Sequence, residues 1–405
     1  MVPSKSSELA LIEDSVIAGH RLQAKATTSN VTCKLFQGFI IFFVLCLLFS
    51  VGAHCLKKHV FGNDDSDHKL FRDEMPKQGE INLLRKMLPD EVRDVDDAVL
   101  SEFEKLVKDL NITYASNDDI IKRFQTFTDN LKKIEHLQSR STNALFGANR
   151  FALMSDDELR AYVMPYAEHS RTVSTLLSES ETVDEAAAPL PTRPAFVDWR
   201  TRGVVTRVKD QGSCGSCWAF AVTATIESLR AIRGHPLEER SEQELIDCDD
   251  DNNGCHGGYR PYAFRYIKES GLTLEKLYFY MAKKQSCRKI TGQKVKISGW
   301  KSFPLDESYL ADWVAANGPV TIGVNVTRGM FAYKSGVFAP TAEDCAHKSL
   351  GSHALAVVGY GEENGDTYWL LKNSWGTSAG ENGYLKMKRG VNSCGIGHAA
   401  FGPVA

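Results

Sequence analysis

The sequence has no surplus of basic residues, no internal repeat and no dominant low-complexity tract. Its 405 residues carry a formal net charge of -3, so the overall charge argues against nucleic acid as a partner. Hydrophobic residues make up 43% of the chain and charged residues 24%, which is ordinary for a protein with a packed core. At roughly 100–200 residues per domain, the length allows two or three domains.

Cysteine is absent from a long central stretch, residues 56–213. Three cysteines precede this stretch and seven follow it. In an oxidising compartment, an odd set of seven predicts three disulfides and one free thiol. The alternative is seven reduced cysteines in a cytosolic core, which a hydrophobic segment near the N-terminus disfavours. The seven residues are Cys214, Cys217, Cys248, Cys255, Cys287, Cys345 and Cys394.

Charge is absent from residues 35–53, a largely apolar run of 19 residues. As a helix the run would span about 28 Å at about 1.5 Å per residue, close to the hydrocarbon thickness of a bilayer. A cleavable signal peptide is the alternative, with Val51-Gly52-Ala53 as its cleavage site. Because 34 residues precede the run, which is long for a signal peptide, we favour a signal-anchor transmembrane helix. The cysteine argument then places the C-terminal part in the lumen or outside the cell.

Helical periodicity is strong between residues 102 and 137. Apolar side chains recur there at steps of 4, 3, 4 and 3, which predicts a helix with one apolar face. The residues of this face are Ile120, Phe124, Phe127, Leu131 and Ile134.

Composition divides the rest of the chain. A stretch with three prolines and many small or polar residues, 169–194, predicts a linker and a processing site. The expected parts are a cytoplasmic tail (1–34), the membrane anchor (35–53), a pro-region with an inhibitory helical domain at about 100–165 (54–192) and a globular domain (193–405).

N-glycosylation sequons begin at Asn111 and Asn325 on the expected lumenal side. A third, at Asn30, would be cytosolic under this topology and therefore unmodified.

The most specific motif is Gln-Gly-Ser-Cys-Gly-Ser-Cys-Trp at residues 211–218. A helical pattern runs from Trp218 to Arg233 and stops at Gly234, so Cys217 is expected at a helix N-terminus. The free N–H groups and the dipole of that end favour a thiolate, the species that attacks a carbonyl. The same helix end offers a backbone N–H to an oxyanion, and the Gln211 amide is well placed in sequence as a second donor.

A thiol nucleophile needs a base, and His353 begins a short apolar strand pattern. The imidazole must be held in one orientation by an acceptor on its second nitrogen. Asn373, in the motif Asn-Ser-Trp-Gly at residues 373–376, supplies such an acceptor without adding charge. Trp375 would cover that hydrogen bond and exclude water. The candidate catalytic residues are Cys217, His353, Asn373 and Gln211.

Two other interpretations of the pair Cys214 and Cys217 are disfavoured. A zinc site would need a second CxxC or an HxxxH pair, and the sequence contains neither. A dithiol oxidoreductase would usually have its tryptophan before the CxxC motif, not after it. We therefore expect no metal and no cofactor.

These motifs resemble those of the papain family of cysteine proteases, cathepsin L-like enzymes included. The resemblance extends from Val197 almost continuously to the C-terminus. It implies an α+β, papain-like two-domain fold with a helical left domain, a β-barrel-like right domain and the active site in the cleft between them. It also implies the disulfides Cys214–Cys255, Cys248–Cys287 and Cys345–Cys394; cysteine counting alone leaves 15 pairings open among six cysteines.

The upstream helix resembles the family's inhibitory propeptide. The resemblance implies that residues at about 100–190 fold onto the cleft as an inhibitor and chaperone, and that the apolar face of the helix packs on the catalytic domain. A ladder of residues at helical spacing matches that propeptide, with conservative replacements at both ends: Asp119, Arg123, Phe127, Asn130, Ile134 and Gln138. A second motif reads Gly147, Asn149, Phe151 and Leu153, where the last position is usually Asp. That Asp is thought to help acid-triggered activation, so the pH dependence of processing is in question. The long pro-region behind an anchor resembles apicomplexan, especially piroplasm, enzymes.

The sequence departs from the family pattern in three places. Ser352 precedes the histidine where Asp or Asn is common, Ser378 and Ala379 replace a Gly-Trp pair, and Arg240 replaces a Leu. Loss of the second Trp should weaken packing around Asn373, but it removes no reacting group, so we expect lower activity or stability, not inactivity.

The resemblance also implies a substrate-binding set. Small residues at several of these positions suggest an apolar P2 preference for Leu or Phe. Arg260 would instead favour an acidic or polar P2, or point to solvent, as long Arg side chains usually do. The expected substrate-binding residues are Gly257, Gly258, Tyr259, Arg260, Gly323, Gly351, Ser352, Ala354, Trp375 and Ala399.

The favoured hypothesis is a cysteine endopeptidase made as a zymogen. The alternatives are a non-catalytic paralogue acting as a binding module, which would usually lack the nucleophile or the base, and an exopeptidase or transpeptidase variant. Expected partners are peptide substrates, the chain's own propeptide and cystatin-like inhibitors, with a monomer as the assembly. By resemblance, the mature enzyme would act in an acidic lysosome-like compartment or digestive vacuole, or be secreted.

Overall fold

The computed structural model describes residues 85–165, 181–182 and 193–405, apart from residues 293 and 304. All of them belong to one of the chain's two units, 78–405. The predicted tail, anchor and most of the linker lie outside the described residues. Within the described part of the chain, no helix is both long enough and apolar enough to cross a membrane.

The described part of the pro-region includes the helices α3 (Asp90–Arg93), α4 (Asp97–Asp109) and α5 (Asn117–Ser139). The turn after α4 contains Asn111 in the left-handed region, with φ of 50°. Ser116 then caps α5, because its hydroxyl accepts a hydrogen bond from the N–H of Asp119 (3.2 Å). The predicted apolar helix is therefore confirmed as α5.

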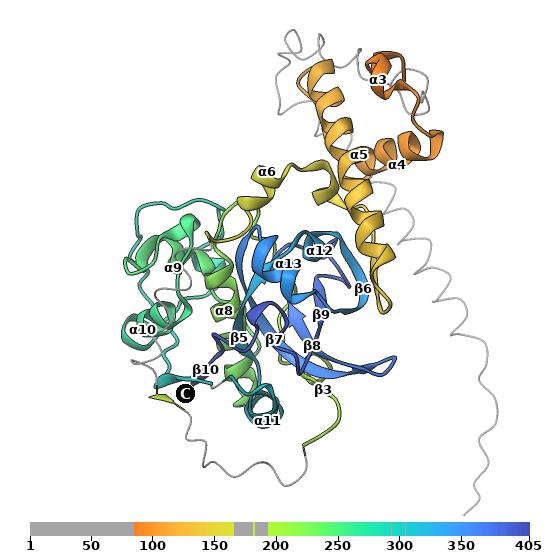
Figure 1. Ribbon diagram of the computed structural model, residues 1–405. Coiled ribbons are helices and arrows are strands. Elements are labelled where there is room, and N and C mark those ends of the chain that lie inside the picture. The colour runs from red at the N-terminus through yellow and green to blue at the C-terminus, as the bar shows by residue number, and fades with distance from the viewer. Residues whose placement is uncertain (1–84, 166–180, 183–192, 293, 304) are drawn as a thin grey trace, which may run out of the picture. The chain divides into compact units, whose positions relative to one another are not determined.

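The buried face of α5 packs largely within the pro-region itself. The ring centroid of Phe103 on α4 lies 5.2 Å from that of Phe124 and 5.5 Å from that of Phe127. Leu153 covers the same face, and the only buried member from beyond residue 193 in this described cluster is Ala332. We expected the catalytic domain to cover this face, and that expectation was wrong, because α4 crosses α5 and covers it first (Figure 1).

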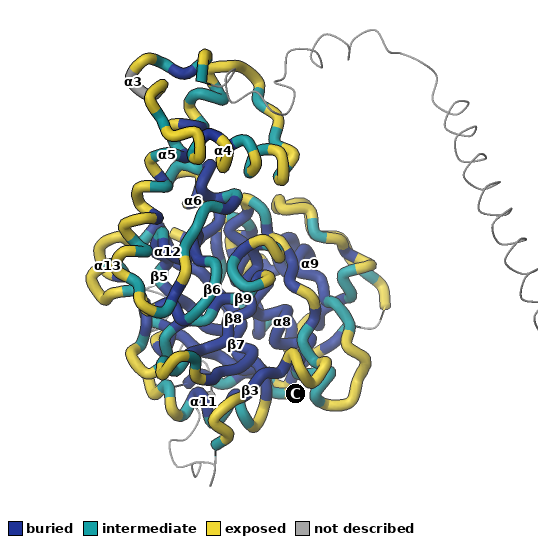
Figure 2. The backbone as a smooth tube through the Cα atoms, turned by 90° about the vertical axis from the view of Figure 1, so that its right-hand side faces the viewer, coloured by how far each residue is buried: buried dark blue, intermediate teal, exposed yellow. Residues whose placement is uncertain are grey.

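Three helices make up the helical part of the globular domain: α8 (Cys217–Ile232), α9 (Glu242–Cys248) and α10 (Arg260–Ser270). Every residue of α8 from Cys217 to Ser228 is buried. The predicted helix after the Cys-Trp motif is confirmed, and Figure 2 shows α8 as a buried segment beside the central strands. A helix apolar on all sides belongs inside a core.

The strands of the described residues form one sheet in the order β1-β6-β9-β8-β7-β5-β10-β4-β2, with β3 paired to β7. The longest strand, β7, lies between β5 and β8 and contacts α8, so it joins the sheet to the helical part. The strands are β1 (Ala144–Phe146), β2 (Glu181–Thr182), β3 (Val197–Asp198), β4 (Gly299–Ser302), β5 (Val320–Val326), β6 (Tyr333–Phe338), β7 (Gly351–Glu363), β8 (Asp366–Lys372), β9 (Tyr384–Lys388) and β10 (Phe401–Val404).

The pro-region contributes an edge strand at each end of this sheet, β1 beside β6 and β2 beside β4. β1 runs antiparallel to β6, with Ala144 opposite Gly336. Gly336 has a φ of 80°, and a Cβ atom there would lie 2.0 Å from the carbonyl oxygen of Asn143. Only glycine permits so close an approach of the pro-region backbone.

Short elements connect these parts, and three disulfides link the loops. Cys214–Cys255, Cys248–Cys287 and Cys345–Cys394 are all formed, so the pairing implied by the resemblance is confirmed. The short elements are η1 (Arg150–Leu153), α6 (Asp156–Arg160), η2 (Trp199–Arg202), η3 (Gly254–His256), η4 (Glu275–Leu277), α11 (Glu307–Asn317), α12 (Arg328–Ala332), α13 (Ala342–His347) and η5 (Ser393–Gly395).

Candidate active site

Cys217 is the one free cysteine of the described residues and the first residue of α8. Its preceding residue, Ser216, makes no side-chain cap, so the helix end keeps its backbone N–H groups available. The thiol is buried, and the N–H of Ala354 donates to its sulfur at 3.4 Å. Burial raises the pKa of Cys217 to about 11 while the pro-region is in place, which keeps the thiol protonated.

His353 comes from the opposite side, on β7, where it is paired with Val324 of β5. Its Nε2 lies 2.8 Å from Oδ1 of Asn373. That oxygen is an acceptor and also accepts the N–H of Ser374 at 2.7 Å, so Nε2 carries the imidazole proton. Nδ1 is buried without a hydrogen-bond partner among the described residues and is therefore the nitrogen free to exchange a proton. Burial lowers the pKa of His353 to about 4.

Aromatic rings hold the imidazole in place. Trp375 stacks on His353 with ring centroids 4.6 Å apart, and Phe331 stacks on Trp375 with ring centroids 4.4 Å apart. Phe151 of the pro-region meets the edge of the same tryptophan at 5.5 Å. The predicted cover over the His353–Asn373 bond is present, whereas the role of Phe331 was not predicted.

Gln211 lies beside these groups, fixed from several directions. Its Oε1 accepts the hydroxyl of Ser374 at 2.6 Å, and its carbonyl accepts the hydroxyl of Tyr280 at 2.6 Å. The side-chain Nε2 donates to the carbonyl of Cys214 at 2.7 Å and to that of Tyr162 at 3.0 Å. The roles of Ser374 and Tyr280 were not predicted, although Ser374 lies inside the Asn-Ser-Trp motif.

The pro-region pairs with the start of β7, next to the apolar cluster that contains Cys217. Met164 and Ser352 exchange two backbone hydrogen bonds of 2.7 and 2.8 Å, as in a short antiparallel pair. The Met164 side chain packs in one apolar cluster with Cys217, Ala354 and Ala399. The segment therefore fills the space that a peptide substrate would need, along the strand edge that would bind it.

The expected substrate-binding residues gather around Met164, with some differences. A Cβ atom on Gly257 would lie 3.4 Å from Met164 Cγ, and one on Gly258 would lie 2.6 Å from the Trp218 ring, so both glycines permit close approach. Gly351 lies against Val163 and Met164 in the same way. Gly323 is opposite Ala354 in the β5–β7 pair, one strand further on. Tyr259 precedes α10 and is half-buried.

Arg260 is buried, which contradicts one of the two alternatives left open for it, a side chain that points to solvent. Its exposed fraction is 3%, and its guanidinium carbon lies 5.4 Å from the ring centroid of Phe401. Nη1 is buried without a hydrogen-bond partner among the described residues. Burial lowers the pKa of Arg260 to about 10, opposed by the negative charge that Cys217 can carry. Arg260 is the first residue of α10, and it is buried together with the next residue of that helix.

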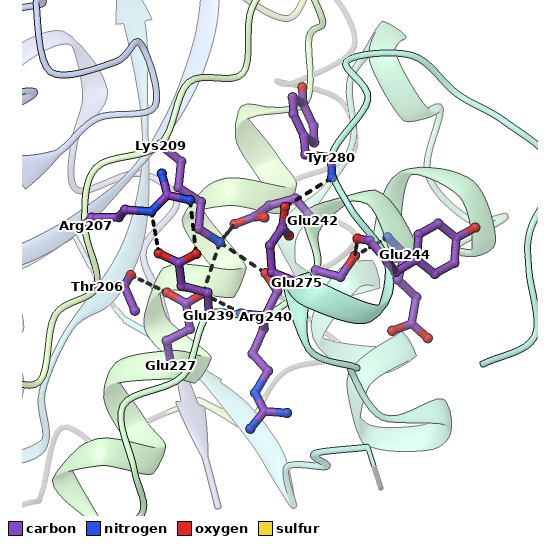
Figure 3. A network of polar contacts seen from close by, with 12 residues as sticks. Thr206, Arg207, Lys209, Glu227, Glu239, Arg240, Glu242, Glu244, Glu275 and Tyr280 are labelled. Atoms are coloured by element: carbon purple, nitrogen blue, oxygen red, sulfur yellow. Dashed lines mark hydrogen bonds and ion pairs between the residues drawn. The ribbon is translucent and has the colours of Figure 1, made fainter. Parts of the chain in front are cut away.

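A buried ionic network lies around Lys209, two residues before Gln211 in the chain (Figure 3). The Lys209 ammonium lies 2.7 Å from Glu242 of α9 and 3.2 Å from Glu227 of α8. Lys372, next to Asn373, donates to the hydroxyl of Thr206 at 2.7 Å. Although burial opposes it, the two carboxylates raise the pKa of Lys209, so the lysine stays charged. The network links α8 and α9 to the loop before the site.

Arg240 and Ala379 lie in defined contacts, whereas the buried hydroxyl of Ser352 has no hydrogen-bond partner among the described residues. Arg240 is buried, and its guanidinium pairs with Glu238 at 2.7 Å. Ala379 is buried, and its carbonyl accepts the N–H of Gly383 at 2.8 Å; Gly383 in turn accepts the N–H of Asn373 at 3.0 Å. Within the described residues, no cluster of three His, Cys, Asp or Glu residues could hold a metal ion.

Comparison with known proteins gives two family matches. Residues 193–404 match the papain family cysteine protease model, and residues 103–159 match the cathepsin propeptide inhibitor domain (I29). Papain of Carica papaya is 38% identical over 313 residues, covering 75% of this chain and 86% of papain. Cathepsin F of Drosophila melanogaster is 38% identical over 305 residues, covering 72% of this chain but only 48% of that protein. The structure of digestive procathepsin L2 from Tenebrio molitor larval midgut aligns with a TM-score of 0.69 and 32% identity, covering 76% of this chain and 100% of that one.

Proposed function

Because the chain belongs to the papain family of cysteine proteases and carries the family's inhibitor domain, we propose that Cys217, His353, Asn373 and Gln211 carry out its peptide-bond hydrolysis. The activity itself, that of a cysteine endopeptidase made as a zymogen, follows from membership. The assignment of roles to residues is supported by one observation above all. Nε2 of His353 is held by Asn373, which leaves Nδ1 for the thiol.

The proposed reaction runs in two halves. The Cys217 thiol gives its proton to Nδ1 of His353, and the thiolate attacks the substrate carbonyl. Nε2 of Gln211 and the backbone N–H of Cys217 donate to the oxyanion. The imidazolium then returns its proton to the leaving amine, and a thioester remains on Cys217. Water, deprotonated by His353, hydrolyses this thioester and releases the acid.

Release of the pro-region is the proposed activating step. In the zymogen, burial raises the pKa of Cys217 and lowers that of His353, so both groups are neutral. When the pro-region leaves, water and substrate replace it, and the thiolate–imidazolium pair becomes favourable. We place the start of the mature enzyme near residue 193, where the peptidase match begins.

Substrate choice is proposed to favour an apolar P2 side chain such as Leu or Phe. The apolar Met164 side chain, packed with Ala354 and Ala399, supports this. The buried, unpartnered Nη1 of Arg260 supports the second candidate, an acidic P2. A side-by-side assay of four peptides with Leu, Phe, Glu or Arg at P2 decides. Glu ahead of Leu by tenfold in kcat/KM would reject the apolar preference.

The test of the catalytic assignment uses the full-length chain in neutral detergent micelles at acidic pH. Wild type is expected to process itself near residues 185–195 and to cleave a Leu-Arg fluorogenic peptide, while Cys217→Ala does neither. If wild type stays intact, an outside protease supplies the cut. Correctly cut, folded protein that neither turns over the peptide nor reacts with an epoxide at Cys217 would reject the assignment in favour of a non-catalytic binding module.

We further propose that residues 35–53 anchor the precursor as a type II membrane protein of the secretory pathway, on the way to an acidic lysosome-like compartment. The three disulfides support an oxidising compartment. Translation into microsomes tests this: a chain that resists carbonate extraction and whose residues 54–405 are protected from protease is expected. A free, shortened lumenal product would instead indicate a cleaved signal peptide.

Glycosylation, inhibition and assembly complete the proposal. Asn111 is exposed, which supports its modification. Asn325 is half-buried on β5, so we expect it to be modified less fully. Cystatin-like inhibitors would bind the open cleft of a monomeric mature enzyme. Mass spectrometry of the secreted protein before and after glycosidase treatment measures occupancy at each site.

A further inference from the structure

A large cavity lies where α5 of the pro-region meets α12, α13 and the loop after β6. Its volume is about 760 Å³, and Cys217 and its neighbours take no part in its lining. Among the charged residues that line it, six are Lys or Arg and three are Asp. The cavity therefore has an excess of positive charge that the catalytic mechanism does not use.

The cations come from both sides of the contact between pro-region and peptidase. Lys132, Lys133 and Arg140 lie in the pro-region on or next to α5, while Arg328 and Lys348 belong to the peptidase. A cavity with one side on the inhibitor and the other on the enzyme exists in this form only while the two are docked.

Each of two carboxylates in the cavity is shared between one cation from each side. Asp156 lies 3.8 Å from Lys133 and also contacts Arg328. Asp344 lies 2.7 Å from Lys348 and 3.6 Å from Arg140. The third carboxylate, Asp366, pairs with Lys388, which is outside the lining. Two carboxylates thus serve four cations. Lys132 and Arg160 pair with Asp129 (3.4 Å) and Asp157 (3.8 Å), outside the lining, so four carboxylates serve the six cations and an excess of positive charge remains.

Lys133 and Arg328 share one carboxylate, and Arg140 and Lys348 share another, so an anion bound in the cavity would reduce the repulsion within each pair. Burial, followed by the charge of Arg328, lowers the pKa of Lys133, and burial lowers that of Arg328. Both groups would gain from a negative ligand. Arg and Lys are the usual partners of phosphate and sulfate oxygens, and the volume suits a ligand with several such groups.

We propose that this cavity binds an anion carrying at least two phosphate or sulfate groups, and that the bound anion holds the pro-region on the peptidase. Because the ligand contacts both sides, it binds the docked zymogen more tightly than the separated parts. Binding therefore shifts the equilibrium toward the docked state by a factor of 1 + [L]/Kd, which is about tenfold at ten times Kd. Maturation that begins with release of the pro-region slows by the same factor.

Binding is measured by calorimetry on the full-length Cys217→Ala zymogen in neutral detergent. The probes are sodium tripolyphosphate and a heparin hexasaccharide, with sodium sulfate at matched ionic strength as the reference. One site per chain is expected for at least one probe, and the tighter probe tells a phosphate source from a sulfated saccharide. Lys132→Gln combined with Lys133→Gln, and separately Lys348→Gln, should each weaken Kd at least tenfold.

The matched control is Lys105→Gln combined with Lys108→Gln, which removes two exposed charges from α4, outside the cavity. This pair should leave Kd unchanged. Absence of binding by both probes, or equal weakening by the control pair, overturns the proposal.

Maturation is followed on the wild-type zymogen at acidic pH, with the better probe at ten times its Kd. Processing should slow about tenfold in wild type and at most about twofold in Lys348→Gln, whose Kd is at least tenfold weaker. The processed enzyme, which no longer has α5, should cleave its peptide substrate at the same rate with and without the probe. Faster processing in the presence of the probe, or equal slowing in Lys348→Gln, overturns the proposal even if the probe binds.

Discussion

The side-chain amide of Gln211 donates a 3.0 Å hydrogen bond to the carbonyl oxygen of Tyr162 in the pro-region. The hydroxyl of Ser374 fixes the same amide from its other end at 2.6 Å. The pro-region thus presents a peptide carbonyl to the donor that we assign to the substrate oxyanion. Two residues later, Met164 pairs with Ser352, so inhibition uses the strand edge as well as the oxyanion donor.

Replacement of Gln211 by Ala should lower kcat of the processed enzyme about 10²- to 10³-fold, because one donor to the oxyanion is lost. KM should change little, since that bond is strongest in the transition state. Steady-state kinetics on a fluorogenic peptide measure both constants. Gln285→Ala, at an exposed position of the same domain, is the control. A kcat within threefold of wild type would remove Gln211 from the catalytic set.

Arg150 of the pro-region should contribute measurably to inhibition. Its guanidinium contacts both oxygens of Asp210 (2.6 and 3.1 Å) and the carbonyl of Trp375 (2.9 Å). The pair is partly exposed, so solvent screening limits its contribution to about 1 kcal/mol, or roughly fivefold in the rate of maturation. Arg150→Gln and Asp210→Asn should each speed processing by that factor, and the double variant should add little further.

The control for this cycle is Lys122→Gln, which removes an exposed charge from α5. Its processing rate should equal that of wild type. Fully additive effects of the two single variants would show that Arg150 and Asp210 act independently.

Acidification should destabilise the closed zymogen through His353. Burial lowers its pKa to about 4 in the closed state, against about 6.5 in an exposed chain. Because the pKa is lowered in the closed state, His353 contributes to the free energy of unfolding in full above pH 6.5. This contribution is lost as the pH falls through 4. The full effect is about 3 kcal/mol. It gives the zymogen an acid response even though Leu153 replaces the usual Asp.

Urea unfolding of the Cys217→Ala zymogen at pH 7 and pH 4 measures this effect. The difference in free energy of unfolding between the two pH values should shrink by up to about 3 kcal/mol when His353→Gln is added. His235→Gln, at an exposed histidine, should leave the difference as it is. An unchanged difference in the His353 variant would assign the acid response to other groups.

Sequence motifs identified the candidate catalytic residues because each motif contains both a reactive residue type and a recognisable helix or strand boundary. The Cys-Trp motif opens a helix, and the Asn-Ser-Trp motif follows a strand, so local patterns were enough to place Cys217 and Asn373. Their meeting with His353 rests on the pairing of β5, β7 and β8, which is long-range in sequence. Family resemblance, not spacing, supplied the disulfide pairing.

The supporting contacts could not be read from the sequence. Phe331, Tyr280 and Arg150 lie far along the chain from the groups that they hold, and no local pattern marks them. The sequence left the direction of Arg260 open, because the usual tendency of long charged side chains to reach solvent does not take account of where a helix begins. The face of α5 was assigned to the wrong partner because periodicity shows that a face is buried but not what buries it.

Asn130 of α5 should be essential for holding the pro-region in its inhibitory form. Its side-chain amide is buried and donates to the carbonyls of Ala152 and Met154 (2.8 and 2.9 Å). Those carbonyls lie in and just after the turn η1, which carries Phe151 onto the Trp375 ring. Replacement by Ala leaves two carbonyls without their donor, at a cost of about 2 kcal/mol.

Thermal unfolding of the Cys217→Ala zymogen should therefore show a lower Tm with Asn130→Ala, and the same change in the active chain should speed maturation at least tenfold. Gln125→Ala, on the exposed side of α5, keeps the helix and removes no such bond, so both measurements should match the parent. Processing at the parental rate despite a lowered Tm would mean that Asn130 stabilises the pro-region without positioning Phe151. Because Phe151 and the imidazole of His353 lie on the same tryptophan, we expect the two measurements to change together.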